Sequence, residues 1–477
     1  MKTAARIAGG LLLLVGVAAH AQILSFRHIV VIVQENRTPD NLFQGLCVPP
    51  FGTSASCSTT PTGPQYDIQT SNWLDRSVSG GTIQPGTVAL ANTYDLGHAH
   101  SAFTKMCDLS GNGTGVCQMD GAAAIHCSFT CLSNPQFRYV DNSSGILNPY
   151  LELATQYGWA NYMFQTNQGP SFPAHQFLFG GTSAPSAADD KAGIFAAENL
   201  TGSATIAGCI ADAGTTVELI TPSGEDQSIY PCFEHATMAD LFDARGISWR
   251  YYTPGAGNIW SAPDAIKHIC QPDMPTGGSC TGPDWTRDVV LKPAQVLTDI
   301  SACNLADVTW VVPSGQNSDH AHINTGGGPS WVASIVNTIG NNPRCSDGEV
   351  YWENTAIFIT WDDWGGWYDH EPPTLLAEPE GDYQYGFRVP LIVVSAYTPA
   401  GYVDNGRHDF GSILRFIEHN FRIPEGALQF ADARAQSDLT GFFRLYRTRR
   451  IFQTIFTAIN ATDFVNDQSP PEPPDND

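Results

Sequence analysis

Residues 355–373, TAIFITWDDWGGWYDHEPP, constrain the fold of this 477-residue chain more than any other stretch. The apolar run at 356–361 is rich in β-branched and aromatic residues, which favours a strand buried on both faces, as in a mostly parallel sheet. The run ends at Asp362 and Asp363, and a Gly-Gly turn then leads to a third acid followed by His370. Ligands in open α/β sheets bind beyond the carboxyl ends of the strands, so this pattern predicts a site for a divalent cation. The alternative is an acidic junction whose carboxylates are merely solvated.

A second apolar run, residues 28–33, has the same character and ends in Glu35 and Asn36. Taken alone, such a pair is more typical of a helix cap than of a metal site. Further strands are expected at 247–252, 308–312 and 391–394, and helices at 148–157, 238–245, 328–339 and 413–421, the last capped by Ser412. Because strands alternate with helices, we predict an α/β fold whose large, mostly parallel central sheet is flanked by helices on both faces.

Ser171 lies between two prolines in the segment GPSFPAH at 169–175, where a rigid turn is expected. Its hydroxyl either caps a helix or acts as a nucleophile, and the local pattern favours the cap. Two histidines two residues apart, His98 and His100, are either ligands or hydrogen-bonded loop residues. No G-x-S-x-G motif occurs, which argues against a lipase-like hydrolase.

The first 21 residues have the pattern of a signal peptide. Lys2 and Arg6 precede a short leucine-rich core, and Ala19-His20-Ala21 fits an A-x-A cleavage site. That core is too short to span a bilayer, and no later run approaches about 20 apolar residues, so no transmembrane segment is expected.

Twelve cysteines follow this segment, which predicts disulfides and a secreted or periplasmic location. A zinc site is disfavoured because one close pair of cysteines has no matching second pair. Sequence does not fix the connectivity, and the simplest scheme joins neighbours: Cys47–Cys57, Cys107–Cys117, Cys127–Cys131, Cys209–Cys232, Cys270–Cys280 and Cys303–Cys345.

The formal net charge is −24, and it becomes −26 when Lys2 and Arg6 leave with the signal peptide. Such a surface repels nucleic-acid phosphates and anionic lipid head groups, so no nucleic-acid partner is expected. An anionic substrate would need a local cationic site, which a bound metal would provide.

Several blocks of the chain resemble the bacterial phosphoesterase family that holds phospholipases C and acid phosphatases, within the alkaline-phosphatase superfamily. HIVVIVQENRTPDNLFQG, from residue 28, resembles H-x-V-V-x-x-Q-E-N-R-S-x-D-x-x-F-G, with Thr38 for the usual serine and Gln44 inserted. The block at 362–373 matches D-E/D-x-x-G-G-x-x-D-H-x-x-P-P at every position. SDH at 318–320, GFRVP at 386–390 and the D-x-x-H of residues 95–98 also match. Where the family has D-H-T-S, this chain has HDFGS at 408–412, which leaves the role of His408 open.

The resemblance implies an alkaline-phosphatase-like fold and hydrolysis of phosphate esters, including phospholipids, through a phosphoserine. It makes Ser171 the nucleophile, in place of a cap. The resemblance also implies a divalent metal ion held by Glu35, Asn36, Ser171, Asp362 and Asp363. His98, His320 and His370 would surround the phosphoryl group, with Asp319 and Asp369 orienting them.

Because the matching blocks span residues 28 to about 421, we expect a single catalytic domain over residues 22–462. An acidic tail at 463–477 follows, and the Pro-rich, acidic composition of its end predicts disorder. No protein partner is implied. The alternative from another class is an exported protein that binds metal or phosphate without turnover. An intact nucleophile beside intact metal ligands argues against that alternative.

Overall fold

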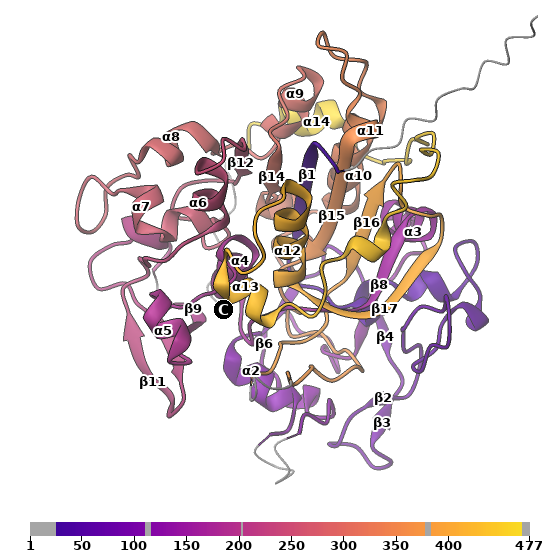
Figure 1. Cartoon of the computed structure of the whole chain (residues 1–477). Coiled ribbons are helices and arrows are strands. Elements are labelled where there is room, and N and C mark those ends of the chain that lie inside the picture. The colour runs from indigo at the N-terminus through magenta and orange to yellow at the C-terminus, as the bar shows by residue number, and fades with distance from the viewer. Residues whose placement is uncertain (1–24, 110–115, 202–203, 377–382, 470–477) are drawn as a thin grey trace, which may run out of the picture.

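Residues 25–109, 116–201, 204–376 and 383–469 are described in the structure, which is a computed structural model (Figure 1). The signal peptide expected at residues 1–21 and the end of the expected tail, residues 470–477, lie outside these ranges. Within them, no helix is both long and apolar enough to cross a membrane.

Eight strands form the central sheet, in the order β13-β12-β14-β1-β15-β16-β8-β17. Their bounds in that order are Val289–Val290, Trp249–Tyr252, Val308–Val311, His28–Gln34, Thr355–Trp361, Leu391–Ser395, Gly158–Phe164 and Tyr402–Asp409. Strand β16 runs antiparallel to both of its neighbours, and all the other pairs in this sheet are parallel. The predicted α/β fold with a large, mostly parallel sheet is confirmed.

Strands β1 and β15 lie side by side in the middle of this sheet. All seven residues of each strand are buried, as expected for apolar runs that are covered on both faces. Their register pairs His28 with Thr355 and Gln34 with Trp361, so the two strands end at the same level. The polar residues that follow them are therefore brought to one point at the carboxyl edge of the sheet.

Alternation along β15 directs side chains to helices on opposite faces of the sheet. The Phe358 ring packs against Phe416 of helix α12 (Phe410–Phe421), with ring centroids 5.0 Å apart. Trp361, three positions further on, packs against Tyr150 of helix α3 (Asn148–Gln156) at 5.1 Å. Each large side chain buried in this way stabilises the fold by roughly 1.5–3 kcal/mol. Helices therefore cover both faces, as predicted (Figure 1).

The remaining elements surround this core. The other α-helices are α1 Pro39–Leu42, α2 His100–Met106, α4 Ser171–Gly180, α5 Ala187–Lys191, α6 Met238–Asp243, α7 Lys267–Cys270, α8 Pro283–Asp288, α9 Gln295–Ser301, α10 Gly328–Asn341, α11 Tyr351–Asn354, α13 Gln429–Arg434 and α14 Ala461–Asn466. Strands β9 (Phe195–Leu200), β10 (Val217–Thr221) and β11 (Gly224–Ile229) form a separate antiparallel sheet. Three two-stranded pairs complete the strands of the described residues: β2 Trp73–Leu74 with β3 Thr82–Ile83, β4 Gly86–Val88 with β7 Arg138–Val140, and β5 Tyr94–Leu96 with β6 Cys127–Phe129.

One predicted cap is wrong. Helix α12 begins at Phe410, and its N-cap is Asp409, whose side chain accepts hydrogen bonds from the backbone N–H groups of Gly411 and Ser412. Ser412 occupies the third helical position, where its hydroxyl accepts from the backbone N–H of Asp409 and so completes a capping box. The sequence-based assignment took the wrong member of this reciprocal pair as the cap.

The ordered part of the chain extends past residue 462, where the acidic tail was expected to begin. Helix α14 continues to Asn466, and its Phe464 is buried against the ring of Trp331 on α10, at a centroid distance of 5.3 Å. Burial of this aromatic side chain against α10 stabilises the folded segment.

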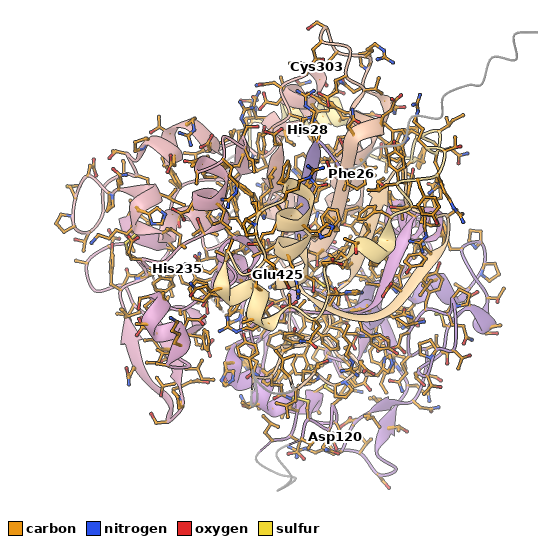
Figure 2. The ribbon with its side chains drawn as sticks, in the orientation of Figure 1. Phe26, His28, Asp120, His235, Cys303 and Glu425 are labelled. Atoms are coloured by element: carbon orange, nitrogen blue, oxygen red, sulfur yellow. A yellow bond between two sulfur atoms is a disulfide. The ribbon has the colours of Figure 1, made fainter. Side chains whose placement is uncertain are left out.

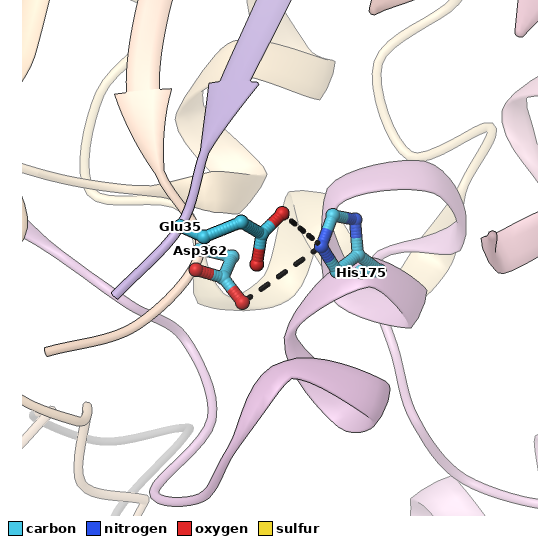
Figure 3. Close-up of side chains that lie close together, drawn as sticks. All are labelled: Glu35, His175 and Asp362. Carbon is cyan, nitrogen blue, oxygen red and sulfur yellow. Dashed lines mark hydrogen bonds and ion pairs between the residues drawn. The ribbon is translucent and has the colours of Figure 1, made fainter. Parts of the chain in front are cut away.

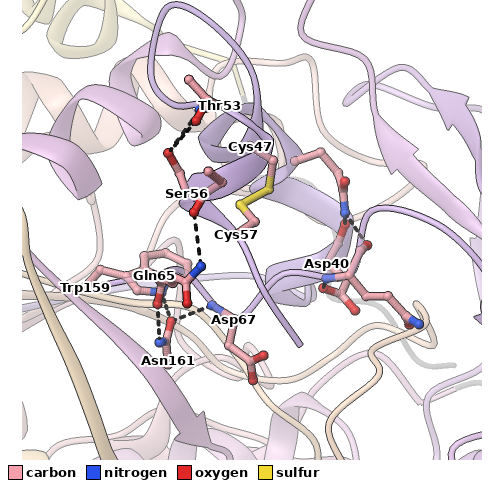
Figure 4. Close-up of a disulfide and its surroundings, with 12 residues drawn as sticks. Asp40, Cys47, Thr53, Ser56, Cys57, Gln65, Asp67, Trp159 and Asn161 are labelled. Atoms are coloured by element: carbon pink, nitrogen blue, oxygen red, sulfur yellow. Dashed lines mark hydrogen bonds between the residues drawn. A yellow bond between two sulfur atoms is a disulfide. The ribbon is translucent and has the colours of Figure 1, made fainter. Parts of the chain in front are cut away.

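The nearest-neighbour disulfide scheme is confirmed for all six pairs. No free cysteine remains among the described residues. Each bridge closes a local loop of 4 to 42 residues. Figure 4 shows the Cys47–Cys57 bridge in the same region as Asp40 and Asp67. Cys303 lies at the upper end of the molecule in Figure 2, above His28, which starts β1, and Asp120 lies at the lower end.

Candidate active site

Four polar residues follow the ends of β1 and β15, and all four side chains are fully buried. The backbone N–H of Asp362 donates to Gln34 O at 3.0 Å, and the backbone N–H of Asn36 donates to Asp362 Oδ1 at 3.1 Å. These bonds extend the pairing of the two strands by one step and set Glu35 and Asn36 beside Asp362 and Asp363. The structure therefore brings together the two motifs that the sequence placed 327 residues apart.

The turn after Asp363 requires glycine. Gly365 has φ +60°, and a Cβ atom at this position would lie 2.4 Å from the carbonyl oxygen of Asn36. Its backbone N–H donates to Asp363 Oδ1 at 2.7 Å, which fixes the carboxylate against the turn. Asn36 itself adopts a left-handed backbone with φ 58°, a conformation that asparagine tolerates better than most residues.

Helix α4 adds a serine and a histidine to these carboxylates. Ser171 is the first residue of α4, and its hydroxyl donates to Asp363 Oδ2 at 3.3 Å rather than capping the helix. His175 lies one turn further on, with Nε2 3.2 Å from Glu35 Oε1 and 3.8 Å from Asp362 Oδ2. Figure 3 shows Glu35 and Asp362 at the strand ends, with His175 facing them from the helix.

Burial dominates the electrostatics of this cluster. It raises the pKa of Glu35 to about 8, and it raises the pKa of Asp362, with the nearby charge of Glu35, to about 7. Burial and the charge of Asp362 raise the pKa of Asp363 well above its usual range. Burial also lowers the pKa of His175 to about 4. Three carboxylates that share a dry site resist ionisation unless a cation neutralises them.

Two buried polar atoms in the cluster are suited to a cation. Asp362 Oδ2 has no hydrogen-bond partner among the described residues. The side-chain oxygen of Asn36 lies 3.2 Å from both Asp362 Oδ1 and Glu35 Oε2, so three acceptors face one another. Rotation of the amide would remove this conflict, and so would a metal ion held by the same three oxygens. The oxygen-rich donor set fits a divalent metal.

His98 and His320 approach the same cluster from two loops. The Nδ1–H of His98 donates to Leu96 O at 2.8 Å, and the Nδ1–H of His320 donates to Ala321 O at 2.7 Å. Their Nε2 atoms face the Asn36 amide nitrogen at 3.0 and 3.3 Å. Main-chain carbonyls thus fix both rings with Nε2 toward the Asn36 amide, an arrangement suited to proton transfer beside the cluster.

His370 lies in a different network from these residues. Its Nδ1 is 2.7 Å from Asp40 Oδ2, and its Nε2 is 3.1 Å from Asp67 Oδ1. Arg388, from the GFRVP block, donates from Nε and one terminal nitrogen to both oxygens of Asp369. Its other terminal nitrogen donates to Asp67. The structure therefore gives His370 a position among carboxylates of the neighbouring loops and not beside Ser171.

The acids expected to orient the histidines have other partners. Asp319 Oδ2 accepts from the Tyr150 hydroxyl at 2.8 Å and from Trp361 Nε1 at 3.0 Å, whereas His320 is fixed by a carbonyl. Asp369 binds Arg388, as described above. His408, whose role the sequence left open, bonds to Ser437 and Asp404 on the edge strand β17 and its neighbouring loop.

His175 is a member of this cluster that was not among the candidate residues predicted from the sequence. A signal was present, since Ser171 and His175 are four residues apart and therefore lie on one face of any helix that contains both. The loop that precedes Ser171 also borders a cavity of about 460 Å³, lined by residues such as Asn167, Gln168 and Tyr383. Of the candidate residues named from the sequence, His100 lines this cavity, whereas Ser171 and the carboxylates at the strand ends do not.

Comparison with known proteins gives the following similarities. The chain is 26% identical to the non-hemolytic phospholipase C of Pseudomonas aeruginosa over 43% of its own length and 32% of that protein. It is 24% identical to phospholipase C A of Mycobacterium tuberculosis over 40% of each chain. It is also 24% identical to the hemolytic phospholipase C of Pseudomonas aeruginosa over 62% of this chain and 41% of that one. The alignments thus span about a third to two fifths of these relatives.

Among solved structures, a protein in the alkaline phosphatase superfamily from Vibrio parahaemolyticus matches 57% of this chain and 60% of its own, with a TM-score of 0.31 and 11% identity. The model of the Phosphoesterase family matches residues 26–424, which include both strand-end motifs and Ser171. The chain belongs to the Phosphoesterase family.

Proposed function

We propose that the protein is a secreted, metal-dependent hydrolase of phosphate esters in which Ser171 is the nucleophile. The observation that carries this proposal is the position of the Ser171 hydroxyl, which starts helix α4 and donates to Asp363 Oδ2 at 3.3 Å inside a cluster of three buried carboxylates. A serine that neither caps its helix nor reaches solvent has few structural reasons to lie there. Family membership and the phospholipase C relatives support the same class of reaction.

Glu35, Asn36, Asp362, Asp363 and the Ser171 oxygen would hold the metal ion. When bound, a divalent metal supplies positive charge that favours the serine alkoxide and neutralises phosphoryl oxygens. The protein residues hold the donor atoms in place. The strand pairing fixes Glu35 against Asp362, and the Gly365 N–H fixes Asp363.

Ser171 passes its hydroxyl proton to Asp363 Oδ2, which already accepts its hydrogen bond, and attacks phosphorus in line with the ester oxygen, so that the Oγ–P bond forms as the P–O bond to the alcohol breaks. His98 or His320 donates the proton that the leaving alkoxide needs, from Nε2. In the second half of the reaction, water attacks the phosphoserine and gives one proton to the histidine. The P–Oγ bond then breaks, and Asp363 returns its proton to the Ser171 oxygen. The N-terminus of α4 adds a favourable dipole for the phosphoryl oxygens.

His370 has a positioning role in this proposal. Together with Arg388 it ties the loop that follows Asp363 to Asp40 and Asp67. The substrate is a phosphate ester of a small alcohol or of a lipid. The names of the relatives make a phospholipid the first candidate to test.

The decisive experiment compares Ser171→Ala with Ser334→Ala, which removes a buried serine on α10 far along the chain. Turnover of an aryl phosphomonoester and of phosphatidylcholine is measured for each, together with metal content. We expect Ser171→Ala to keep its fold and most of its metal while it loses several orders of magnitude in rate, because the covalent path is gone. Ser334→Ala should retain its rate.

Acid quench of the wild type with labelled substrate should trap phosphate on the peptide that contains Ser171. Near wild-type turnover in Ser171→Ala would refute the covalent mechanism. A wild type that binds metal and phosphate but hydrolyses neither substrate would favour the exported binding protein instead.

A further inference from the structure

His175 is the member of the buried cluster that the proposed mechanism does not use. We propose that His175 Nε2 is a direct ligand of the same metal ion, which makes the centre a mixed oxygen and imidazole site. This inference rests on the proposed function and deepens it, because it concerns which metal the site selects.

The position of the proton on His175 follows from its neighbour Tyr251. The single hydroxyl proton of Tyr251 is donated to Trp260 O at 2.9 Å. The Tyr251 oxygen lies 3.4 Å from His175 Nδ1 and can therefore only accept from it. The proton of a neutral His175 ring is then on Nδ1, and the lone pair of Nε2 points to the two carboxylates.

A lone pair directed at carboxylate oxygens is unfavourable unless a proton or a metal ion lies between them, and a bound metal ion would take the place of the protons that the buried carboxyl groups otherwise hold. Nε2 is 3.2 Å from Glu35 Oε1 and 3.8 Å from Asp362 Oδ2, and the latter oxygen has no hydrogen-bond partner among the described residues. With metal–ligand bonds of about 2.1 Å, these separations correspond to ligand–metal–ligand angles of about 100° and about 130°. One ligand atom each from Glu35, His175 and Asp362 lies within 4.8 Å of the other two, a grouping that could hold a single ion.

The surrounding helix makes this arrangement rigid. His175 and Ser171 are one turn apart on α4, and every residue of this helix is buried. The histidine therefore cannot leave the carboxylates without moving the proposed nucleophile. His175 and Ser171 reach the same carboxylates from one face of α4. This arrangement is expected if both side chains belong to one set of metal ligands.

An imidazole ligand changes the preferred metal. Mg²⁺ and Ca²⁺ favour all-oxygen sites, whereas manganese, iron, cobalt and zinc accept imidazole nitrogen readily. The alternative is that His175, as an imidazolium, donates a hydrogen bond to Glu35 and only orients that ligand. The two roles differ in whether a nitrogen atom is bonded to the metal.

The test is pulsed electron paramagnetic resonance of metal-depleted full-length protein loaded with one equivalent of Mn²⁺. The wild type should show ¹⁴N modulation from a coordinated imidazole, and His175→Gln should bind Mn²⁺ without it. His235→Gln, which replaces another buried histidine, is the matched control and should keep the signal. Calorimetric titration should also show that the preference for Zn²⁺ over Mg²⁺ falls at least tenfold in His175→Gln.

Bound Mn²⁺ without ¹⁴N modulation in the wild type would overturn the inference and leave the proposed hydrolase standing. A wild type that binds none of these metals would overturn both. Because the wild-type spectrum is informative by itself, the test does not depend on the folding of His175→Gln.

Discussion

His370 offers two donors to a single oxygen of Asp40, since its backbone N–H and its ring Nδ1 lie 3.0 and 2.7 Å from Oδ2. The other ring nitrogen faces Asp67 Oδ1 at 3.1 Å. A histidine with a carboxylate at each ring nitrogen is held as the imidazolium. Burial by itself lowers the pKa of His370, but Asp40 and Asp67 outweigh burial and raise the pKa to about 10. Such a group stays charged at neutral pH, which suits a structural ion pair better than a proton shuttle.

The ion pairs of His370 with Asp40 and Asp67 make the stability of the protein fall at alkaline pH. The pKa of His370 is about 10 in the folded state and about 6.5 when unfolded. Its stabilising contribution is therefore complete below pH 6.5, declines as the pH rises above that value and is lost above about pH 10. Calorimetric melting from pH 6 to pH 10 should show a steeper fall in Tm for the wild type than for His370→Gln. The exposed His419, changed to Gln, is the control, and parallel curves for wild type and His370→Gln would contradict the assignment.

Removal of one carboxylate should empty the metal site. Asp362→Ala deletes a ligand and a charge from the centre, so we expect affinity for divalent metal to fall by about a hundredfold or more. Metal content after dialysis, measured by mass spectrometry, checks this. Asp264→Asn changes another fully buried carboxyl group and should leave metal content unchanged. Full occupancy in Asp362→Ala would remove the basis for the site.

Metal binding should release protons. In the metal-free protein the pKa values of Glu35 and Asp362 are raised to about 8 and about 7, so the folded state holds protons that the unfolded state loses above about pH 4. The stability of the metal-free protein should consequently decrease as the pH rises from 4 to 8. Calorimetric titration with Zn²⁺ at pH 6.5, in buffers of different ionisation enthalpy, should report net proton release. Enthalpies that are independent of the buffer would argue against the raised pKa values.

The disulfides should be complete in the isolated protein. Thiol titration of unfolded but unreduced protein should find close to zero free thiols, and peptide mapping should recover the neighbouring pairs. Reduction should lower Tm, because each short loop contributes roughly 2–3 kcal/mol. A count of nearly twelve thiols would show both the pairing and the oxidising compartment to be wrong.

Local sequence patterns predict the central strands and the residues at their ends, but they do not predict the partners of His370. The apolar, β-branched composition of β1 and β15 predicts two buried strands. Their parallel pairing then places Glu35 next to Asp362. The partners of His370 could not be anticipated in the same way. Asp40 and Asp67 lie 330 and 303 residues away, and Asp67 belongs to a polar stretch that looks like a surface excursion. Contacts between loops depend on the assembled sheet and leave no periodic signal in the chain.

The misassigned N-cap of α12 shows a second, smaller limit of prediction from the sequence. In a capping box the first and fourth residues bind each other reciprocally, and either one looks like the cap when the helix boundary is unknown. Asp409 is the last residue of β17 and the N-cap of α12, so the helix boundary lies three residues earlier than the pattern suggested.

The six disulfide loops follow one another along the chain without overlapping, and this has a consequence for a nicked molecule. A single proteolytic cut between Phe164 and Cys209, or between Cys345 and Thr355, would leave two fragments with no covalent connection. The sheet would still hold them together, because β8 and β1 lie in one half of the chain and β15, β16 and β17 in the other. A nicked molecule would thus elute as one particle in native buffer and run as two bands on a denaturing gel, with or without reductant.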